Sequence, residues 1–284
     1  MQMKRKKLWI TLSIVCASII IVCIVLSLVF KLKTVDIEFR TRVVQAETNL
    51  PAGIKDRVLE SGDFDYSKNT LFANFDKNIE KIEKENPYVK VEQVIRYFPN
   101  KVKVFISERL PRYRVQDAED TNRWYILDSE FKVLDKVTTE EVKTKLICSG
   151  SSTYYNKTVE IDAASLKVSS HIGEFIKNSK VMKNMLEITK GIYGRTEDVA
   201  VAKSISFDKN NNFVITLKNS ASATDDGCKI QVSELTDLRM RVFAAVDLYM
   251  DTIEADPTVD LLSAVITVDV NKNLNGEYIA RFAQ

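Results

Sequence analysis

The chain has 284 residues, of which 45% are hydrophobic and 28% charged, enough for folded cores beside a membrane segment. Its formal net charge is +2, but the first 33 residues hold six basic residues and no acidic one, so the remainder carries 35 basic against 39 acidic residues. Nucleic-acid phosphates require a basic surface, so this mildly acidic remainder argues against nucleic-acid binding.

Residues 8–30 form one uncharged apolar run, LWITLSIVCASIIIVCIVLSLVF. As a helix this run would extend about 34 Å, and the hydrocarbon core of a bilayer is about 30 Å thick. A cleaved secretory signal is the alternative, but its apolar stretch is usually about 7–15 residues long and ends in small residues. The length of the run therefore favours an uncleaved transmembrane helix.

The charges that flank this run predict its orientation. Residues 4–7 read KRKK, whereas the other flank carries only Lys31 and Lys33. Because basic flanks stay on the cytoplasmic side, residues 1–7 are expected to form a short cytoplasmic tail. The rest of the chain is then expected outside the membrane, as in a single-pass protein of the cell membrane.

Residues 33–108 combine strand and helix periodicities, which is typical of a small α+β domain. The segment 34–39 alternates apolar and polar residues and predicts a strand directly after the membrane. Residues 51–62 predict a short helix, with Pro51 near its first turn and Gly62 near its end.

A second helix is expected to begin at Asn74, which can cap it, and to stop before Pro87. Phe75, Ile79 and Ile82 have the i, i+4, i+7 spacing of one apolar helix face. The domain therefore has the predicted order β-α-α-β-β, with both helices on one face of a three-stranded sheet. Its last two strands are predicted at residues 88–97 and 101–107.

Residues 109–284 are mixed and rich in short strands. Helices are predicted at 166–189, with Ile172, Phe175, Ile176 and Ile188 as apolar contributors, and at 234–253. A polar stretch at 208–212 predicts a hairpin loop. Strands are predicted at 123–128, 131–137, 144–148, 202–208, 213–218, 228–232, 261–270 and 278–282.

The last two of these strands flank Asn275-Gly276, a dipeptide that is a strong hairpin signal. We expect the strand at 278–282 to lie at a sheet edge, and Arg281 is the only charge that protects it. An edge with so little protection indicates that a partner strand pairs there. The alternative is an internal strand that completes the core. The predicted partner-binding residues are Val268, Tyr278, Ile279, Ala280, Arg281 and Phe282.

Four cysteines occur in the chain. Cys16 and Cys23 lie within the predicted membrane helix, where they act as small apolar residues. Cys148 and Cys228 lie in the outer part, where a disulfide is permitted, and either a disulfide or two buried thiols fits the sequence. Neither pair has the spacing of a zinc site.

No catalytic, metal or cofactor site is predicted, and no small-molecule substrate. The single histidine, His171, has no nucleophile motif near it and is expected at the surface or at a helix end. Residues 129–132 match the S-x-x-K pattern of penicillin-binding enzymes without its companion motifs. Residues 269–275 resemble a calcium loop, but Leu274 replaces the required glycine. The protein is therefore expected not to be an enzyme.

These patterns together resemble the FtsQ/DivIB family of bacterial division proteins, which have one membrane helix, a POTRA domain and a β domain. The resemblance is clear over residues 31–137 and faint from there to the final hairpin. Glu130-Phe131 stands where the family tends to have glycine, and Asn271 stands where arginine is common. The segments that carry the resemblance are NTLF (69–72), NPYVK (86–90), RYFPN (96–100), ERLP (108–111), WYILD (124–128), ITVDV (266–270) and YIARF (278–282).

The resemblance implies an α+β chain divided into a tail (1–7), a transmembrane helix (8–30), a POTRA domain (33–108) and a β domain (109–284). It further implies a non-enzymatic scaffold at the division septum. Such a scaffold binds FtsL and FtsB/DivIC-type proteins outside the membrane and helps to control septal peptidoglycan synthesis.

Two other functions fit the sequence less well. POTRA domains also occur in secretion and envelope-assembly machines, but no lipid-facing barrel strands follow the domain here. A membrane-anchored cell-wall enzyme is the weaker alternative, because the chain has one histidine and no catalytic motif.

Overall fold

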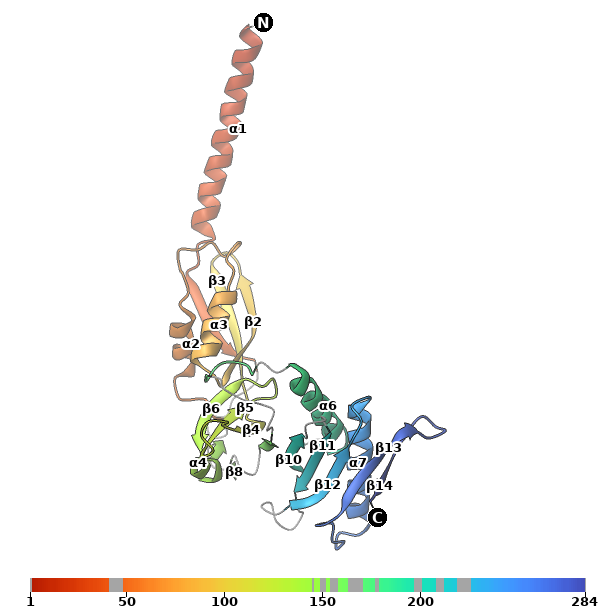
Figure 1. The fold of residues 1–284 in the computed structure, drawn as a ribbon. Coiled ribbons are helices and arrows are strands. Elements are labelled where there is room, and N and C mark those ends of the chain that lie inside the picture. The colour runs from red at the N-terminus through yellow and green to blue at the C-terminus, as the bar shows by residue number, and fades with distance from the viewer. Residues whose placement is uncertain are drawn as a thin grey trace. The chain divides into compact units, whose positions relative to one another are not determined.

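The computed structural model describes residues 2–40, 48–144, 146–148, 152–153, 158–162, 171–176, 179–196, 201–207, 212–218 and 226–283. The chain divides into two compact units, coloured in chain order in Figure 1. The first unit comprises Met1–Val43 and Leu50–Glu108, and the second comprises Val44–Asn49 and Arg109–Gln284.

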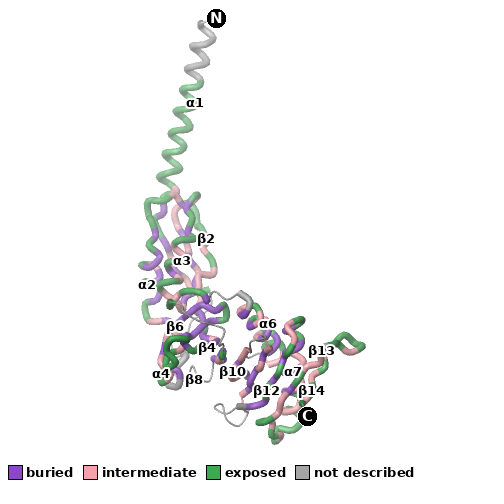
Figure 2. Tube along the Cα trace, in the orientation of Figure 1, coloured by how far each residue is buried: buried purple, intermediate pink, exposed green. Residues whose placement is uncertain are grey.

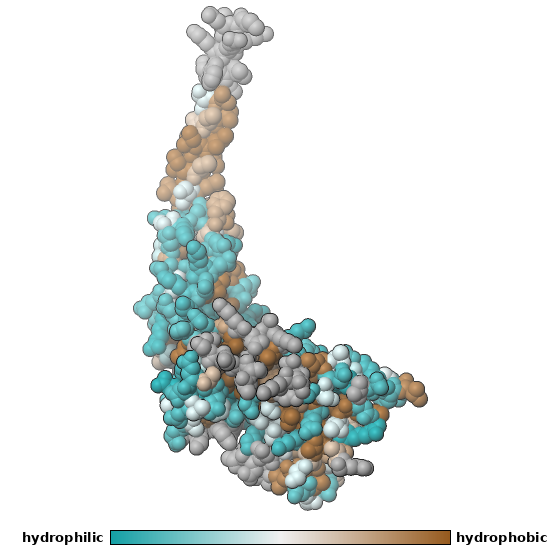
Figure 3. Space-filling view, in the orientation of Figure 1, coloured by the Kyte–Doolittle hydropathy of each residue, from teal (hydrophilic) through white to brown (hydrophobic). Residues whose placement is uncertain are grey.

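The chain begins with a long helix, α1 (Gln2–Val29). Its segment Leu12–Val29 has a mean hydropathy of 3.1 and is 0% buried (Figure 2), and the face of it seen in Figure 3 is mostly apolar. These 18 residues extend about 27 Å as a helix. By length and composition α1 can cross a membrane, in agreement with the predicted transmembrane helix.

The rest of the first unit is a three-stranded sheet with two helices on one face (Figure 1). The strand order is β1-β3-β2, with β1 parallel and β2 antiparallel to the central strand. The predicted β-α-α-β-β order is confirmed. The elements are β1 (Thr34–Phe39), α2 (Ile54–Gly62), α3 (Asp76–Glu85), β2 (Val89–Tyr97) and β3 (Lys101–Glu108).

Buried and partly exposed residues alternate along β3, and the buried ones form part of the core of this unit. Val102, Val104 and Ile106 are each 0% exposed, and they pack with Val58 of α2 and Ile82 of α3. Burying one such side chain contributes about 1.5–3 kcal/mol. The helices therefore cover the sheet face that this alternation makes apolar.

Both helices begin differently from the prediction. Pro51 lies before α2, which starts at Ile54 after Gly53, and Gly53 has a φ of 73° that glycine adopts without steric cost. The side-chain oxygen of Asn74 accepts the Asp76 N–H at 2.8 Å, one residue before the position that caps α3.

The predicted apolar face of α3 is only partly buried. Phe75 and Ile82 are buried, whereas Ile79 is half-buried and lines a groove with Val91 and Val94 of β2. The reason is that β2 is an edge strand, so that in the described part of the chain no further strand extends the sheet beneath Ile79.

The second unit is built on a nine-stranded mixed sheet in the order β14-β13-β12-β11-β10-β9-β4-β5-β6. The pairs β4–β9, β9–β10 and β12–β13 are parallel, and the others are antiparallel. Two short strands, β7 (Leu146–Cys148) and β8 (Ser152–Thr153), pair separately. The sheet strands are β4 (Tyr113–Gln116), β5 (Arg123–Leu127), β6 (Val133–Thr138), β9 (Val159–Asp162), β10 (Ala202–Phe207), β11 (Phe213–Lys218), β12 (Asp226–Val232), β13 (Val265–Lys272) and β14 (Tyr278–Phe282).

Two long helices, α6 (Ser179–Thr196) and α7 (Leu238–Ala255), pack on this sheet, and a short one, α4 (Thr139–Thr144), follows β6. The helices α6 and α7 approach closely at Gly191. A Cβ there would lie 2.7 Å from the carbonyl oxygen of Arg239 in α7, so a larger residue would push the helices apart. Met185, Ile188, Val242 and Val246 are fully buried between the helices and the strands.

The predicted helix at 166–189 is partly wrong. Residues 166–170 lie outside the described residues, and residues 171–176 are not helical. Gly173 has a φ of 88°, which a helix cannot contain, and the segment bonds to residues 131–133 through backbone hydrogen bonds. Ile176 and Ile188 are buried as expected, whereas Ile172 and Phe175 are exposed.

The remaining predictions for the second unit differ from the structure mainly in where helices and strands begin and end. The helix predicted at 234–253 is α7, which begins at Leu238. Residues 208–211 of the predicted hairpin loop lie outside the described residues, although β10 and β11 pair antiparallel as expected. The sequence did not predict β4 or β9, two four-residue strands paired in parallel.

Substitutions in α3 test how it packs. Ile82→Asp should lower the stability of the first unit by about 3–5 kcal/mol, because it removes buried contacts and buries an unpaired carboxylate. Ile79→Asp is the matched control and should cost less, because Ile79 is half-buried. Hydrogen exchange of peptides covering β1 and β3 measures the effect in the full-length protein. Unchanged protection in Ile82→Asp would contradict the observed core.

Candidate partner-binding site

The final strand, β14, lies at the end of the nine-stranded order. Among the residues that the structure describes, it pairs only with β13 (Figure 1). The predicted edge position is therefore confirmed, and the alternative of an internal strand is wrong. Binding of a partner at this edge remains a prediction.

The register shows which backbone groups of β14 are open. Ala283 donates its N–H to the Val265 carbonyl at 2.7 Å, and Phe282 and Ala280 stand opposite Ile266 and Val268. Backbone groups of successive residues in a strand point to opposite sides. The N–H and C=O groups of Ala280 and Phe282 therefore point away from β13, where a further strand can pair.

The side chains of β14 divide between two faces. Tyr278, Ala280 and Phe282 are half-buried, and Ala280 and Phe282 pack against the main core. Ile279 is 37% exposed on the other face, where the Arg281 side chain is 65% exposed. The structure thus brings the predicted residues together, because Val268 lies opposite Ala280 and is itself half-buried.

The only charge on β14 is neutralised across the hairpin. Arg281 pairs with Asp269 of β13 at 2.7 Å. Charged side chains on an edge strand normally discourage pairing with other chains. This exposed ion pair leaves the edge without a net charge of its own.

The start of β14 is tied to the start of α7. The Tyr278 hydroxyl donates to Asp237 at 2.9 Å, and Lys272 pairs with the same carboxylate at 3.0 Å. The guanidinium of Arg241 lies 4.3 Å from the centre of the Tyr278 ring. Hydrogen bonds from Lys272 and Tyr278 lower the pKa of Asp237 below its usual value.

Arg241 is the buried centre of this arrangement. It is 2% exposed, and it donates to the carbonyls of Thr236 at 2.9 Å and of Asp269 at 2.8 Å. Sequence reasoning missed Arg241, Asp237 and Lys272. Their approach is set by tertiary packing, and the sequence shows only that Arg241 falls among the apolar positions of a helix.

A groove with both apolar and charged side chains runs between α7 and the β13–β14 hairpin, and its charged residues are Asp247, Asp251, Lys272 and Glu277. Met240, Phe243 and Leu248 line one wall, and Tyr278 and Ala280 line the other. Met240 is 53% exposed. The groove adjoins the open edge, so that a strand added to β14 can place apolar side chains in it.

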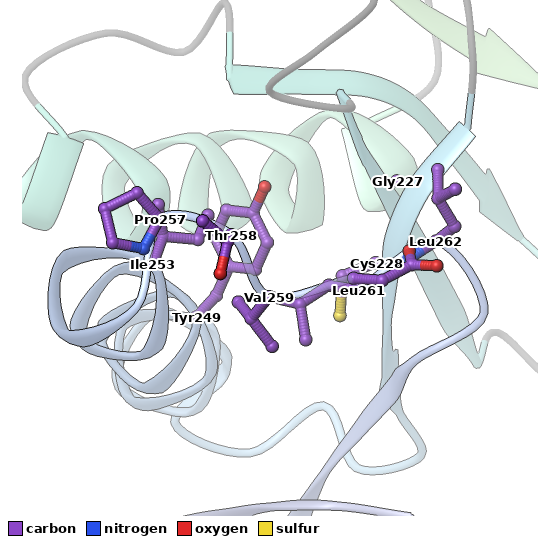
Figure 4. A pocket seen from close by; sticks show the side chains of 10 residues that line it. Gly227, Cys228, Tyr249, Ile253, Pro257, Thr258, Val259, Leu261 and Leu262 are labelled. Carbon is purple, nitrogen blue, oxygen red and sulfur yellow. The ribbon is translucent and has the colours of Figure 1, made fainter.

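A second pocket, lined by Cys228, Tyr249, Ile253, Val259 and Leu261 among others, offers no comparable chemistry (Figure 4). Cys228 is a buried free thiol, and burial raises its pKa to about 11. A protonated thiol is a poor nucleophile. The side chain of Cys148 lies outside the described residues.

The histidine and the S-x-x-K residues, which were candidates for catalytic chemistry, lie in turns or loops. His171 has a 91% exposed side chain beside Glu174. Ser129 is exposed in the turn before β6, and Lys132 is buried there. The described residues contain no group of three or more His, Cys, Asp or Glu that could hold a metal ion.

Alkylation of Cys228 tests its burial. Iodoacetamide at pH 8 should modify Cys228 much more slowly in native than in urea-unfolded protein, because the raised pKa keeps the native thiol protonated. Peptide mass spectrometry measures the modified fraction. Equal rates in both states would contradict the buried position.

The raised pKa of Cys228 also predicts that the stability of the second unit falls as the pH rises above about 9, where only the unfolded thiol ionises.

No protein-family model matches the chain. The chain is 23% identical to the "Cell division protein DivIB" of Clostridium tetani (strain Massachusetts / E88) over 203 residues. This similarity covers 71% of this chain and 68% of that protein. Together with the single apolar helix and the division into two compact units, the similarity supports the resemblance of this chain to the FtsQ/DivIB family of bacterial cell division proteins.

Proposed function

We propose that the protein is a non-enzymatic scaffold of the division machinery that binds partners through the edge of β14. The open backbone groups of Ala280 and Phe282 carry this proposal. The partner is a membrane protein of the FtsL or FtsB/DivIC type, bound at the division septum. By holding such partners the scaffold helps to control septal peptidoglycan synthesis.

The partner adds a strand to β14. Main-chain hydrogen bonds to Ala280 and Phe282 supply affinity, and alternate partner side chains enter the groove beside Met240 and Phe243. Tyr278 is held by Arg241 and Asp237 before the partner arrives. A preordered edge lowers the entropic cost of binding. The proposed contact residues are Val268, Tyr278, Ile279, Ala280, Arg281 and Phe282.

The proposed topology places residues 1–7 in the cytoplasm, residues 8–30 in the membrane, and a POTRA domain (33–108) and β domain (109–284) outside. The basic sequence KRKK at 4–7 supports this orientation. Partners that control cell-wall synthesis act on the outer side, so the binding edge must be there.

The orientation is tested with reporters fused after Gln284. An alkaline phosphatase fusion should be active and a cytoplasmic fluorescent reporter inactive, because the basic residues hold the N-terminus inside. Replacing all four residues 4–7 by glutamine is the control and should lower the fraction correctly oriented. A mature form that begins near residue 31 would show a cleaved signal instead.

Two proline substitutions test the edge. Ala280→Pro removes an N–H that points away from β13, so it should weaken partner binding at least about tenfold while the thermal unfolding temperature changes little. Ile279→Pro is the matched control, because its N–H points toward β13, and it should loosen the hairpin itself. Biolayer interferometry with the outer segment of an FtsB/DivIC-type protein measures binding. Full binding by stably folded Ala280→Pro would remove β14 from the interface.

A further inference from the structure

The last turn of α1 continues into the folded part of the first unit without a free linker. Leu32 is 2% exposed and donates its N–H to the Lys68 carbonyl at 2.9 Å. Lys33 donates to the Asn100 carbonyl at 2.8 Å. The chain that leaves the helix is therefore paired within two residues of Phe30.

Two loops, the one before α3 and the one between β2 and β3, contact the end of α1. Thr70 donates its backbone N–H to the Phe30 carbonyl at 2.7 Å, and its hydroxyl lies 3.0 Å from the same oxygen. Asn69 donates a side-chain N–H to the Leu26 carbonyl at 3.3 Å. The Phe98 ring meets the Phe30 ring edge to face, with centroids 5.8 Å apart. These contacts join the loop before α3 and the β2–β3 loop to the end of α1.

Both loops expose aromatic side chains. Phe98 in the β2–β3 loop is 58% exposed, and Tyr97, the last residue of β2, is 44% exposed. Phe72 is 85% exposed and Tyr66 is 43% exposed on the loop before α3. Aromatic rings of this kind are enriched at the boundary between the bilayer and water.

Basic groups surround the same end of the unit. Lys31, Lys33 and Lys68 are exposed. Asp65 is the nearby acid, and hydrogen bonds from Ser67, assisted by the charges of Lys68 and Lys31, lower its pKa. Because three lysines outnumber this one ionised acid, the cluster has a net positive charge, which attracts anionic lipid head groups.

We propose that this end of the first unit is a membrane-binding surface that lies in the head-group layer of the leaflet from which α1 emerges. We call it the lipid-facing end and define it by residues 30–33, 66–72 and 97–100. Phe98 and Phe72 enter the boundary between head groups and acyl chains, and the lysines contact lipid phosphates. The first unit is thereby held against the bilayer.

The bilayer is the occupant that the structure favours, because the apolar segment Leu12–Val29 ends one residue before Phe30. Any bilayer that α1 spans must reach the lipid-facing end, since Phe98 touches the first residue beyond that segment. A protein partner would have to displace lipid from this position. The proposal depends on membrane anchoring by α1 and is independent of the edge of β14.

Tryptophan quenching by brominated lipid tests the proposal in the full-length protein. The protein is reconstituted into vesicles of phosphatidylcholine and phosphatidylglycerol, with bromine on the acyl chains close to the glycerol. The variants Phe98→Trp and Phe72→Trp should lose emission to the brominated lipid and show a blue shift. The signal of the two native tryptophans is subtracted by measuring the unsubstituted protein.

Glu85→Trp is the matched control at the other end of the unit. Glu85 is exposed at the end of α3, and β2 spans about 26 Å between that end and the lipid-facing end, at about 3.3 Å per residue. Its emission should not change with brominated lipid. The proposal is overturned if the indole of Phe98→Trp or Phe72→Trp is quenched no more than that of Glu85→Trp.

A charge variant separates the contribution of the lysines. Replacing Lys31, Lys33 and Lys68 by glutamine should reduce quenching of Phe98→Trp in vesicles that contain phosphatidylglycerol. Quenching in pure phosphatidylcholine should change less, because that lipid has no net charge. Identical quenching with and without the lysines in the anionic vesicles would overturn their assigned role.

Discussion

The requirement that backbone N–H and C=O groups be paired organises both units of this protein. In a bilayer only a helix meets that requirement within one segment, which is why residues 8–30 must be helical. The last carbonyls of a helix have no partner within it. Here the Phe30 carbonyl, just beyond α1, accepts the Thr70 N–H, and Asn69 adds a second hydrogen bond to the Leu26 carbonyl, which already accepts the Phe30 N–H, so the end of α1 is bonded to the rest of the first unit. At β14 the same kind of group is left open, and that difference separates the proposed anchoring end from the proposed binding edge.

The β14 edge needs support, because a two-stranded hairpin has little stability alone. The β13–β14 hairpin receives that support from α7. Arg241 is buried under the Tyr278 ring and bonded to the Asp269 carbonyl, so a single side chain joins the helix to both strands. The pairing groups of Ala280 and Phe282 are held in register while they remain unpaired on the outer side.

Local patterns predicted most of the elements, because alternation and helical spacing are written in neighbouring residues. The β-α-α-β-β order and the β13–β14 hairpin follow from such patterns. The sequence did not reveal β4 and β9, since each has four residues and is stabilised by a strand far away in the chain. Nor could it show that Ile79 faces a groove, because that depends on β2 being the last strand of its sheet. The candidate edge was predictable from its composition, whereas Arg241 and Asp237 meet Tyr278 only through tertiary packing.

The turn before β6 shows how this chain departs from the FtsQ/DivIB pattern without losing the turn. Phe131 has a φ of 63°, a conformation that costs a non-glycine residue about 1 kcal/mol or more. The Asp128 carboxylate accepts the N–H groups of Glu130 and Lys132, each at 2.8 Å, and fixes the turn by side-chain hydrogen bonds. The Phe131 ring stacks on Tyr113 with centroids 5.1 Å apart and is buried in the main core. Packing of the ring thus offsets the backbone cost that a glycine would avoid, and β5 still pairs with β6, with a register shift between Ile126 and Leu127.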